Sequence, residues 1–297
     1  MSSRSYLYVP GDQQAKLERA LDLGVDALIV DLEDSVAAAS KHAARELVAR
    51  WLGDLTRGDE TPGRSPEIWV RINRFGSSES GAIHADLQAA VAPGLTGICL
   101  AKCQSVQEVS QLNELLVEAE RRLGLEVGTV RVSALLESAR GLLAAASIAM
   151  ADRVDRLQIG EADLAADLGL SSGPDEFELL PLRLQVVVAS AAAGIEAPIG
   201  PVSTDFRDLD RFRVSTERLK RLGFGARAVI HPAQVPIVNE IFTPTDEEES
   251  GARLIVDRFE SAVARGEGVI LDKDGRMVDE AVVLAARRIL ARVEQVG

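Results

Sequence analysis

Short apolar runs rich in β-branched residues alternate with longer segments of helical pattern along most of this chain. Such alternation is typical of βα units, in which a buried strand is followed by a helix that packs on the sheet. The apolar runs predict strands at residues 6–9, 27–31, 68–72, 97–100, 130–136, 154–159, 197–202 and 228–230, the seventh being the weakest. The remaining pattern predicts helices at residues 13–23, 40–51, 81–90, 106–123, 142–150, 181–193, 209–222 and 236–242. The chain is therefore expected to have an α/β fold.

The number of these units favours a closed barrel over an open sheet. Eight strand–helix units over about 240 residues match the (β/α)8, or TIM, barrel, which is built from eight parallel strands. A doubly wound sheet would show fewer strands, and no Gly-x-Gly-x-x-Gly pattern follows the first strand. We therefore expect a TIM barrel at residues 1–245.

The residues that follow predict a C-terminal hairpin-helix extension. An acidic run at residues 246–249 suits the start of a helix, where negative charge meets the positive end of the helix dipole. The further elements predicted are hairpin strands at 268–271 and 276–278, their glycine-containing turn at 272–275, and a final helix at 279–293. These elements are too few to form a core alone, so we expect residues 246–297 to pack on the barrel or on a neighbouring subunit.

Charge and composition exclude several function classes. A formal net charge of −13 disfavours nucleic-acid binding, which needs clustered Lys and Arg. No run of 18 apolar residues predicts a membrane span, and the first residues lack the apolar segment of a signal peptide, so a cytoplasmic protein is expected. Only three histidines occur, which disfavours a histidine-based zinc site. The two cysteines, Cys99 and Cys103, lack the spacing of a zinc or redox motif and are expected to be buried thiols.

Two acidic residues end successive apolar strands. Glu137 follows the run 130–136, and Asp163 follows the run 154–159. In a barrel both would face the mouth formed by the carboxyl ends of the strands, where catalytic groups lie. Two carboxylates leave Mg²⁺ with positions for water and substrate oxygens, so we expect a magnesium site; the alternative is that each caps a helix or pairs with an arginine. Glu161 is a rival to Asp163, and Asp167 a weaker one.

Further charges gather at the same predicted rim. Arg71 leaves an apolar strand, and its planar guanidinium suits a substrate carboxylate or enolate or, alternatively, a salt bridge to the acidic loop at residues 31–34. Within that loop, Asp34 is a candidate base, or a helix cap. Lys102 also lies at this rim.

Two other groups are candidates for binding. Lys41 and Arg45, one helical turn apart, are expected to contact a phosphate of the cofactor or, alternatively, to form a solvated helix face. The backbone N–H groups of Gly160, Glu161 and Ala162 suit a substrate carboxylate.

Seven motifs, taken together, resemble the citrate lyase β-subunit-like proteins of the 2-oxo-acid aldolase/citrate lyase superfamily. They appear in order, cover nearly the whole chain, and lie at residues 4–11, 30–36, 70–73, 136–141, 160–164, 228–234 and 275–279. The resemblance implies a TIM barrel, in most members a homotrimer, that cleaves or forms a C–C bond in a 3-hydroxyacyl thioester. It implies that Glu137 and Asp163 hold Mg²⁺ and that Arg71 contacts substrate. It also implies that Asp279 closes over the active site of a neighbouring subunit.

The chain departs from the family pattern at three places. It has Gly160-Glu161-Ala162-Asp163-Leu164 where the family commonly has Gly-Ala-Glu-Asp-Leu, and Leu100-Ala101-Lys102 where Leu-Pro-Lys is common. The segment 198–205 is atypical as well. These changes retain the metal ligands and leave the acyl group open.

Three functions are compatible with these features. The leading one is an enzyme, a Mg²⁺-dependent lyase that splits malyl-, citramalyl- or citryl-CoA into a 2-oxo acid and an acyl thioester. The second is a class II pyruvate-type aldolase acting without coenzyme A; related barrels place a histidine where this chain has Asp34. The third is a carrier-docking subunit of a larger lyase, with an acyl-carrier protein as partner.

Overall fold

The computed structural model describes residues 3–55, 65–77, 81–266, 268–271 and 275–296. By its internal contacts the chain divides into two compact units, Ser3–Asn239 and Glu240–Gly297. The predicted domain boundary after residue 245 stays a prediction. Among the helices of the described ranges, none is long and apolar enough to cross a membrane.

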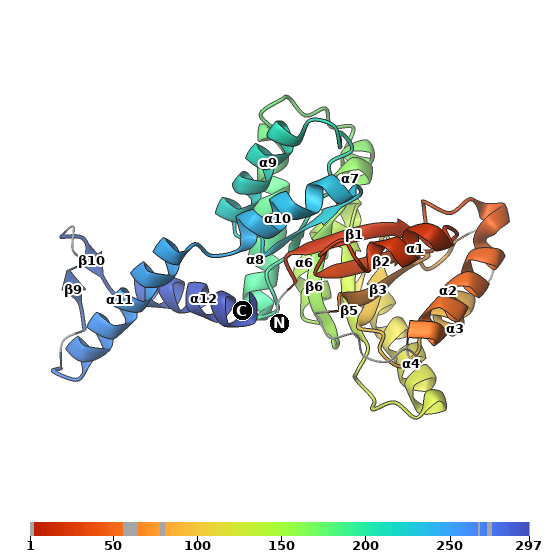
Figure 1. Ribbon diagram of the computed structural model, residues 1–297, viewed down its shortest axis with the longest axis horizontal. Coiled ribbons are helices and arrows are strands. Elements are labelled where there is room, and N and C mark those ends of the chain that lie inside the picture. The colour runs from red at the N-terminus through yellow and green to blue at the C-terminus, as the bar shows by residue number, and fades with distance from the viewer. Residues whose placement is uncertain (1–2, 56–64, 78–80, 267, 272–274, 297) are drawn as a thin grey trace. The chain divides into compact units, whose positions relative to one another are not determined.

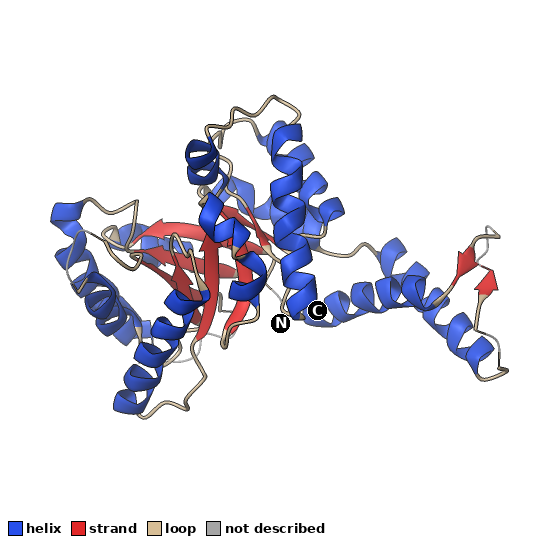
Figure 2. Cartoon of the chain, turned by 180° about the vertical axis from the view of Figure 1, so that it is seen from behind, coloured by secondary structure: helices blue, strands red, loops and turns tan. Residues whose placement is uncertain are grey.

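The first unit is a closed barrel of eight parallel strands in sequential order, which confirms the predicted TIM barrel. Figures 1 and 2 show the strands enclosed by helices. The strands are β1 Ser5–Pro10, β2 Ala27–Asp31, β3 Glu67–Ile72, β4 Gly97–Leu100, β5 Arg131–Leu136, β6 Val154–Ile159, β7 Ile199–Gly200 and β8 Ala226–Val229. The seventh strand, which had the weakest pattern, is also the shortest of these.

The helices follow the prediction with two differences. They are α1 Gln14–Ala20, α2 Lys41–Leu55, α3 Ala82–Ala90, α4 Val106–Leu123, α5 Ala139–Leu143, α6 Ala145–Ala149, α7 Glu161–Leu168, α8 Leu180–Ala193, α9 Leu209–Leu222 and α10 Val235–Phe242. The helix expected at 142–150 is split into α5 and α6 and begins earlier, because the Ser138 hydroxyl accepts the N–H of Gly141 and caps α5. The additional short helix α7 ends at Gly169, whose positive φ terminates it.

The interior of the barrel is filled by side chains that alternate along the strands. This core consists of Tyr6, Ala27, Ile29, Trp69, Cys99, Leu135, Ile199, Ala226 and Ala228. Because successive residues of a strand face opposite sides, residues two positions further along point into the same interior. The pattern therefore determines which side chains line the mouth.

The second unit is a helical hairpin with a small two-stranded sheet. It contains α11 Asp246–Val263, β9 Ile270–Leu271, β10 Met277–Val278 and α12 Glu280–Val296. Thr245 and Glu248 form a capping box at the start of α11, which is where the acidic run predicted a helix. A small core of Phe259, Val278 and Val283 joins the helices to the sheet. The predicted hairpin and final helix are thus confirmed, while residues 272–274 of the expected turn lie outside the described ranges.

Candidate active site

Four side chains from β1, β2, β3 and the end of β5 point into the mouth of the barrel. Each lies two positions after a core residue of its strand and therefore faces the same interior. They are Tyr8, Asp31, Arg71 and Glu137. Asp31, Arg71 and Glu137 are acidic or basic, and all four side chains lie towards the carboxyl ends of the strands, where TIM barrels carry their catalytic groups. This rim is the candidate active site.

Arg71 is held by the acidic loop at residues 31–34. Asp31 lies opposite Arg71 in the β2–β3 register, and its two carboxylate oxygens accept hydrogen bonds from Nε at 2.7 Å and Nη2 at 2.6 Å. Nη1 lies 3.3 Å from Oε2 of Glu33. Burial alone would raise the pKa of Asp31, but the hydrogen bonds and charge of Arg71 outweigh it and lower that pKa. The salt bridge expected as one alternative is therefore present, and substrate contact by Arg71 stays a prediction.

The ring of Tyr8 lies against the Arg71 guanidinium. The guanidinium carbon lies 4.9 Å from the centre of the Tyr8 ring, a cation–π distance. The Tyr8 hydroxyl accepts a hydrogen bond from Nε2 of Gln158 at 2.9 Å. No sequence motif pointed to Tyr8 as a site residue, and its one signal is its position two residues after Tyr6 in the same predicted strand.

Glu137 is buried at the mouth, with 5% of its surface exposed. Its Oε1 accepts the main-chain N–H of Lys102 at 2.8 Å. Burial raises the pKa of the Glu137 carboxyl to about 8; Arg71 and the Lys102 N–H act to lower it, and the neighbouring Asp163 carboxyl raises it further. Asp163, in the first turn of α7, is exposed to solvent. The two predicted ligands are thus brought together.

The carboxyl pair fits a divalent cation. Two carboxylates this close repel each other when both are charged, and a bound cation removes that penalty. Among the described residues no cluster of three or more His, Cys, Asp or Glu side chains is arranged for a metal. Glu137 and Asp163 would supply two carboxylate ligands, which suits an ion such as Mg²⁺ that retains several waters.

The two rivals of Asp163 have other partners. Both oxygens of Glu161 accept from Arg183, at 2.6 and 2.8 Å. Asp167 accepts the N–H of Ala139 at 2.8 Å, at the start of α5. These contacts give both acids structural roles and favour Asp163 as the partner of Glu137.

Lys102 connects two sides of the mouth. Its Nζ lies 2.7 Å from Oε1 of Glu33 and 3.0 and 3.1 Å from the oxygens of Asp34. Burial raises the pKa of Glu33 above its usual range. Burial also disfavours the charged form of Asp34, but hydrogen bonds from Glu33 and Lys102 outweigh it and lower that pKa. Asp34, with a half-exposed side chain, is therefore a charged carboxylate open to solvent.

Lys41 and Arg45 both bind acceptors of the protein. Lys41 donates to the carbonyls of Leu32 and Glu33, at 2.7 and 2.6 Å, and to Oδ1 of Asn73 at 3.0 Å. The Nε of Arg45 donates to Oδ1 of the buried Asp86 at 2.7 Å. The bonds of Lys41 to Leu32 and Glu33 hold the acidic loop in place. Phosphate contact by Lys41 and Arg45 stays a prediction, and it would require a phosphate to join or replace these acceptors.

The remaining candidates also have local roles. The N–H of Gly160 donates to the Leu136 carbonyl at 2.9 Å, while Glu161 and Ala162 open α7, where helical N–H groups lack acceptors within the helix. In the second unit, Oδ1 of Asp279 accepts the N–H groups of Ala281 and Val282, at 3.1 and 3.2 Å, and so caps α12. Contact of these residues with substrate stays a prediction.

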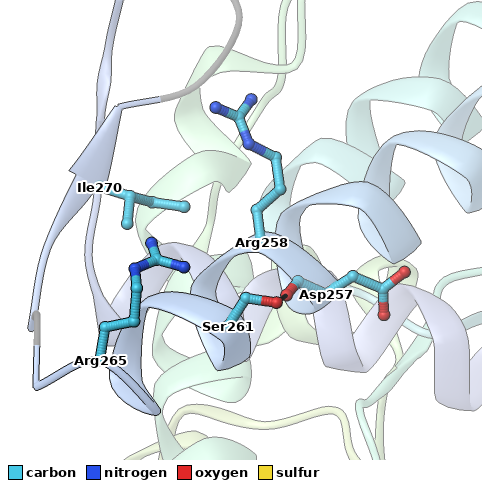
Figure 3. A pocket seen from close by; sticks show the side chains of 5 residues that line it. All are labelled: Asp257, Arg258, Ser261, Arg265 and Ile270. Atoms are coloured by element: carbon cyan, nitrogen blue, oxygen red, sulfur yellow. Dashed lines mark hydrogen bonds between the residues drawn. The ribbon is translucent and has the colours of Figure 1, made fainter.

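A cavity of about 310 Å³ lies within the second unit. Figure 3 shows the side chains that line it, which are Asp257, Arg258, Ser261, Arg265 and Ile270. This lining has two guanidinium groups and one carboxylate, and it lacks the paired carboxylates of the barrel mouth. We therefore place the candidate catalytic centre in the barrel.

Comparisons with known proteins find relatives that match this chain over nearly its whole length. The citrate lyase subunit beta of Leuconostoc mesenteroides subsp. cremoris is 34% identical to this chain, covering 97% of this chain and 92% of that protein. The (3S)-malyl-CoA thioesterase of Cereibacter sphaeroides strain ATCC 17025 is 31% identical, covering 99% and 95%.

Solved structures show the same fold at similar identity. CitE from Mycobacterium tuberculosis, in complex with magnesium, acetoacetate and coenzyme A, is 28% identical with a TM-score of 0.76, covering 99% of this chain and 98% of that one. RipC from Yersinia pestis is 31% identical with a TM-score of 0.67, covering 83% and 98%. The profile of the family described as HpcH/HpaI aldolase/citrate lyase matches residues 4–232. The chain therefore belongs to the HpcH/HpaI aldolase/citrate lyase family, as its motifs predicted.

Proposed function

We propose that this protein is a Mg²⁺-dependent lyase that cleaves, or forms, a carbon–carbon bond in a 3-hydroxyacyl thioester of coenzyme A. The observation that carries the proposal is the pair of carboxyl groups, Glu137 and Asp163, placed together at the mouth of the barrel. The magnesium, acetoacetate and coenzyme A of the M. tuberculosis CitE structure support this choice of metal and thioester.

Glu137 and Asp163 would hold the metal. When bound, Mg²⁺ supplies a positive charge that makes a substrate hydroxyl more acidic. Loss of the hydroxyl proton allows the bond between the hydroxyl carbon and the thioester α-carbon to break. The hydroxyl carbon becomes the carbonyl of a 2-oxo acid, and the electron pair of the bond passes to the thioester as an enolate.

The other residues would manage charge and protons. Arg71, held by Asp31 and Tyr8, would stabilise the negative charge of the enolate, since a guanidinium fixed in place needs no reorganisation during the reaction. Asp34, a charged carboxylate open to solvent, would accept the hydroxyl proton. Asp279 of a neighbouring subunit would return a proton to the α-carbon. This last role requires an oligomer, and we propose a homotrimer.

Binding of the thioester would use groups around the mouth. The N–H groups of Glu161 and Ala162 would bind a substrate carboxylate at the start of α7, whereas the N–H of Gly160 already donates to the Leu136 carbonyl. Lys41 and Arg45 would approach a phosphate of the carrier. An acyl-carrier protein in place of coenzyme A is an alternative carrier, since several relatives are citrate lyase subunits.

The test is incubation of the protein with Mg²⁺ and, separately, malyl-, citramalyl- and citryl-CoA, followed by mass spectrometry of the products. We expect a 2-oxo acid and an acyl-CoA from at least one substrate, and loss of both products in Glu137→Gln and Asp163→Asn. Glu161→Gln and Asp167→Asn are matched controls for fold and local charge, because both acids have structural partners. An active Glu137→Gln or Asp163→Asn enzyme would contradict the proposed site.

The similarity to malyl-CoA thioesterases favours a second candidate function, thioester hydrolysis. Hydrolysis releases free coenzyme A and an intact hydroxy acid, whereas the lyase leaves the acyl group on coenzyme A. The same product analysis therefore separates the two. Free coenzyme A and malate as sole products of malyl-CoA would favour the hydrolase.

A further inference from the structure

The backbone of Lys102 has an unusual conformation. Its φ of 52° lies in the left-handed region, which a glycine adopts without steric cost and a residue with a β-carbon rarely adopts. Lys102 lies two residues after the end of β4, at the rim of the barrel. Such outliers persist where the surrounding contacts require them, and they occur often at functional sites. The contacts of Lys102 indicate what the conformation is for.

The main chain of Lys102 contacts the metal side of the mouth. The left-handed turn directs its N–H to Oε1 of Glu137, at 2.8 Å. The next N–H, that of Cys103, donates to the carbonyl of Leu135 at 3.1 Å, so the chain remains attached to β5 at this point. These two bonds fix the orientation of one Glu137 oxygen.

The side chain of Lys102 contacts the opposite side. Its ammonium, with 26% of the side chain exposed, lies within 3.1 Å of Glu33 and of both oxygens of Asp34. A glycine at this position would preserve the turn but remove these ion pairs. The ion pairs therefore require the lysine side chain, whereas the turn does not.

We propose that Lys102 is a positioning residue that sets the metal ligand Glu137 and the base Asp34 relative to each other through two separate groups. The main-chain N–H orients Glu137, and the ammonium holds Asp34 together with Glu33. The catalytic meaning of this arrangement rests on the proposed lyase function, but the positioning itself does not.

Three variants separate the two groups. Lys102→Gly keeps the left-handed turn and loses the ammonium. Lys102→Met also loses the ammonium but retains a long side chain, so it controls for packing. Lys102→Val disfavours the turn, because a β-branched residue is poorly compatible with positive φ. Lys220→Met, near the end of α9 and outside the proposed site, controls for loss of a lysine.

The first two measurements need no turnover. Titration calorimetry with Mg²⁺ should give nearly wild-type affinity for Lys102→Gly and Lys102→Met, and about 10–100-fold weaker binding for Lys102→Val. Amide hydrogen exchange at residues 33–35 should become about tenfold faster in Lys102→Gly and Lys102→Met, because the loop loses its ion pairs. Lys220→Met should change neither. The proposal is overturned if amide hydrogen exchange at residues 33–35 in Lys102→Gly is as slow as in the wild type. It is also overturned if Lys102→Gly loses its affinity for Mg²⁺.

The third measurement uses the substrate that the product analysis identifies. Lys102→Gly and Lys102→Met should lower kcat roughly 10–100-fold with little change in KM, since the base is misplaced and binding is not. Lys102→Arg, which retains a cation, should recover part of the loss. An unchanged kcat in Lys102→Gly overturns the proposal. If the wild-type protein cleaves none of the thioesters, the lyase function fails, and calorimetry and exchange still decide the role of Lys102.

Discussion

Gly160 lies directly against Glu137. A β-carbon at residue 160 would lie 2.7 Å from both Cβ and Oε2 of Glu137, a distance that packed atoms do not tolerate. We predict that Gly160→Ala displaces the Glu137 carboxyl and weakens Mg²⁺ binding about 10–100-fold, as changes next to metal ligands do. Titration calorimetry measures this.

The matched control is Gly53→Ala. Gly53 lies within α2, and a β-carbon there meets no atom within 4 Å. This variant should raise stability slightly, because alanine favours a helix over glycine, and should leave Mg²⁺ affinity unchanged. Equal Mg²⁺ affinity in both variants would argue against Glu137 as a ligand.

Arg71→Lys should lower turnover by about 10²–10³, the usual loss when one donor to a developing negative charge is removed. Lysine keeps the charge, but it cannot donate to both oxygens of Asp31 while stacking on Tyr8. Steady-state kinetics with the identified thioester measures the effect.

Arg131→Lys is the control, because Arg131 makes a similar set of contacts at the opposite end of the barrel. It stacks on Trp69 at 5.2 Å and pairs with Glu67 and Asp155. We expect this variant to lower Tm without a large loss of kcat. If Arg71→Lys and Arg131→Lys have similar kcat values, the role of Arg71 is structural.

Asp279→Asn should leave Tm and oligomer size nearly unchanged and strongly lower turnover. Asparagine caps helices about as well as aspartate, so the bonds to Ala281 and Val282 survive, but it cannot transfer a proton. Asp208→Asn, at the cap of α9, is the matched control and should remain active. Mixing Asp279→Asn with Glu137→Gln subunits should restore part of the activity if Asp279 acts across subunits. Full activity of Asp279→Asn alone would contradict proton transfer by Asp279 and leave helix capping as its role.

The two thiols should make the protein less stable at alkaline pH. Burial raises the pKa of both Cys99 and Cys103 from 9.0 to about 12, so the folded state keeps them protonated while the unfolded state ionises near pH 9. The contribution of the two protonated thiols to the free energy of unfolding is fully present below pH 9. It is lost as pH rises towards 12, by about 1.4 kcal/mol per pH unit for each thiol. Urea unfolding at pH 8 and pH 10.5 should show a larger loss for wild type than for Cys99→Ala/Cys103→Ala. In native protein at pH 8 neither thiol should react with a disulfide reagent; rapid labelling would contradict their burial.

The sequence alone determined the architecture and the rim on which the site lies. Strand and helix periods differ, so buried strands and amphipathic helices could be recognised one by one, and eight such units favour a closed barrel. The helix predicted at 106–123 has the same bounds as α4, which Ser105 caps at its start and which ends at Gly124 with positive φ. Because all carboxyl ends of parallel strands meet at one rim, Arg71 and Glu137 could be assigned to a common site before any contact was known.

Tertiary structure decided which of the rim groups share contacts. Glu161, Asp163 and Asp167 lie within seven residues of the chain, but their partners lie further away. Arg183 donates hydrogen bonds to Glu161, and an N–H at the start of α5 donates to Asp167. Likewise, the helical spacing of Lys41 and Arg45 suggested a phosphate, whereas the fold supplies protein acceptors for both. The left-handed turn at Lys102 has no signal in its own residue type, because it is stabilised by Glu137 on the next strand and by the acidic loop. Such pairings depend on contacts between residues far apart in the chain, and local periodicity carries no information about them.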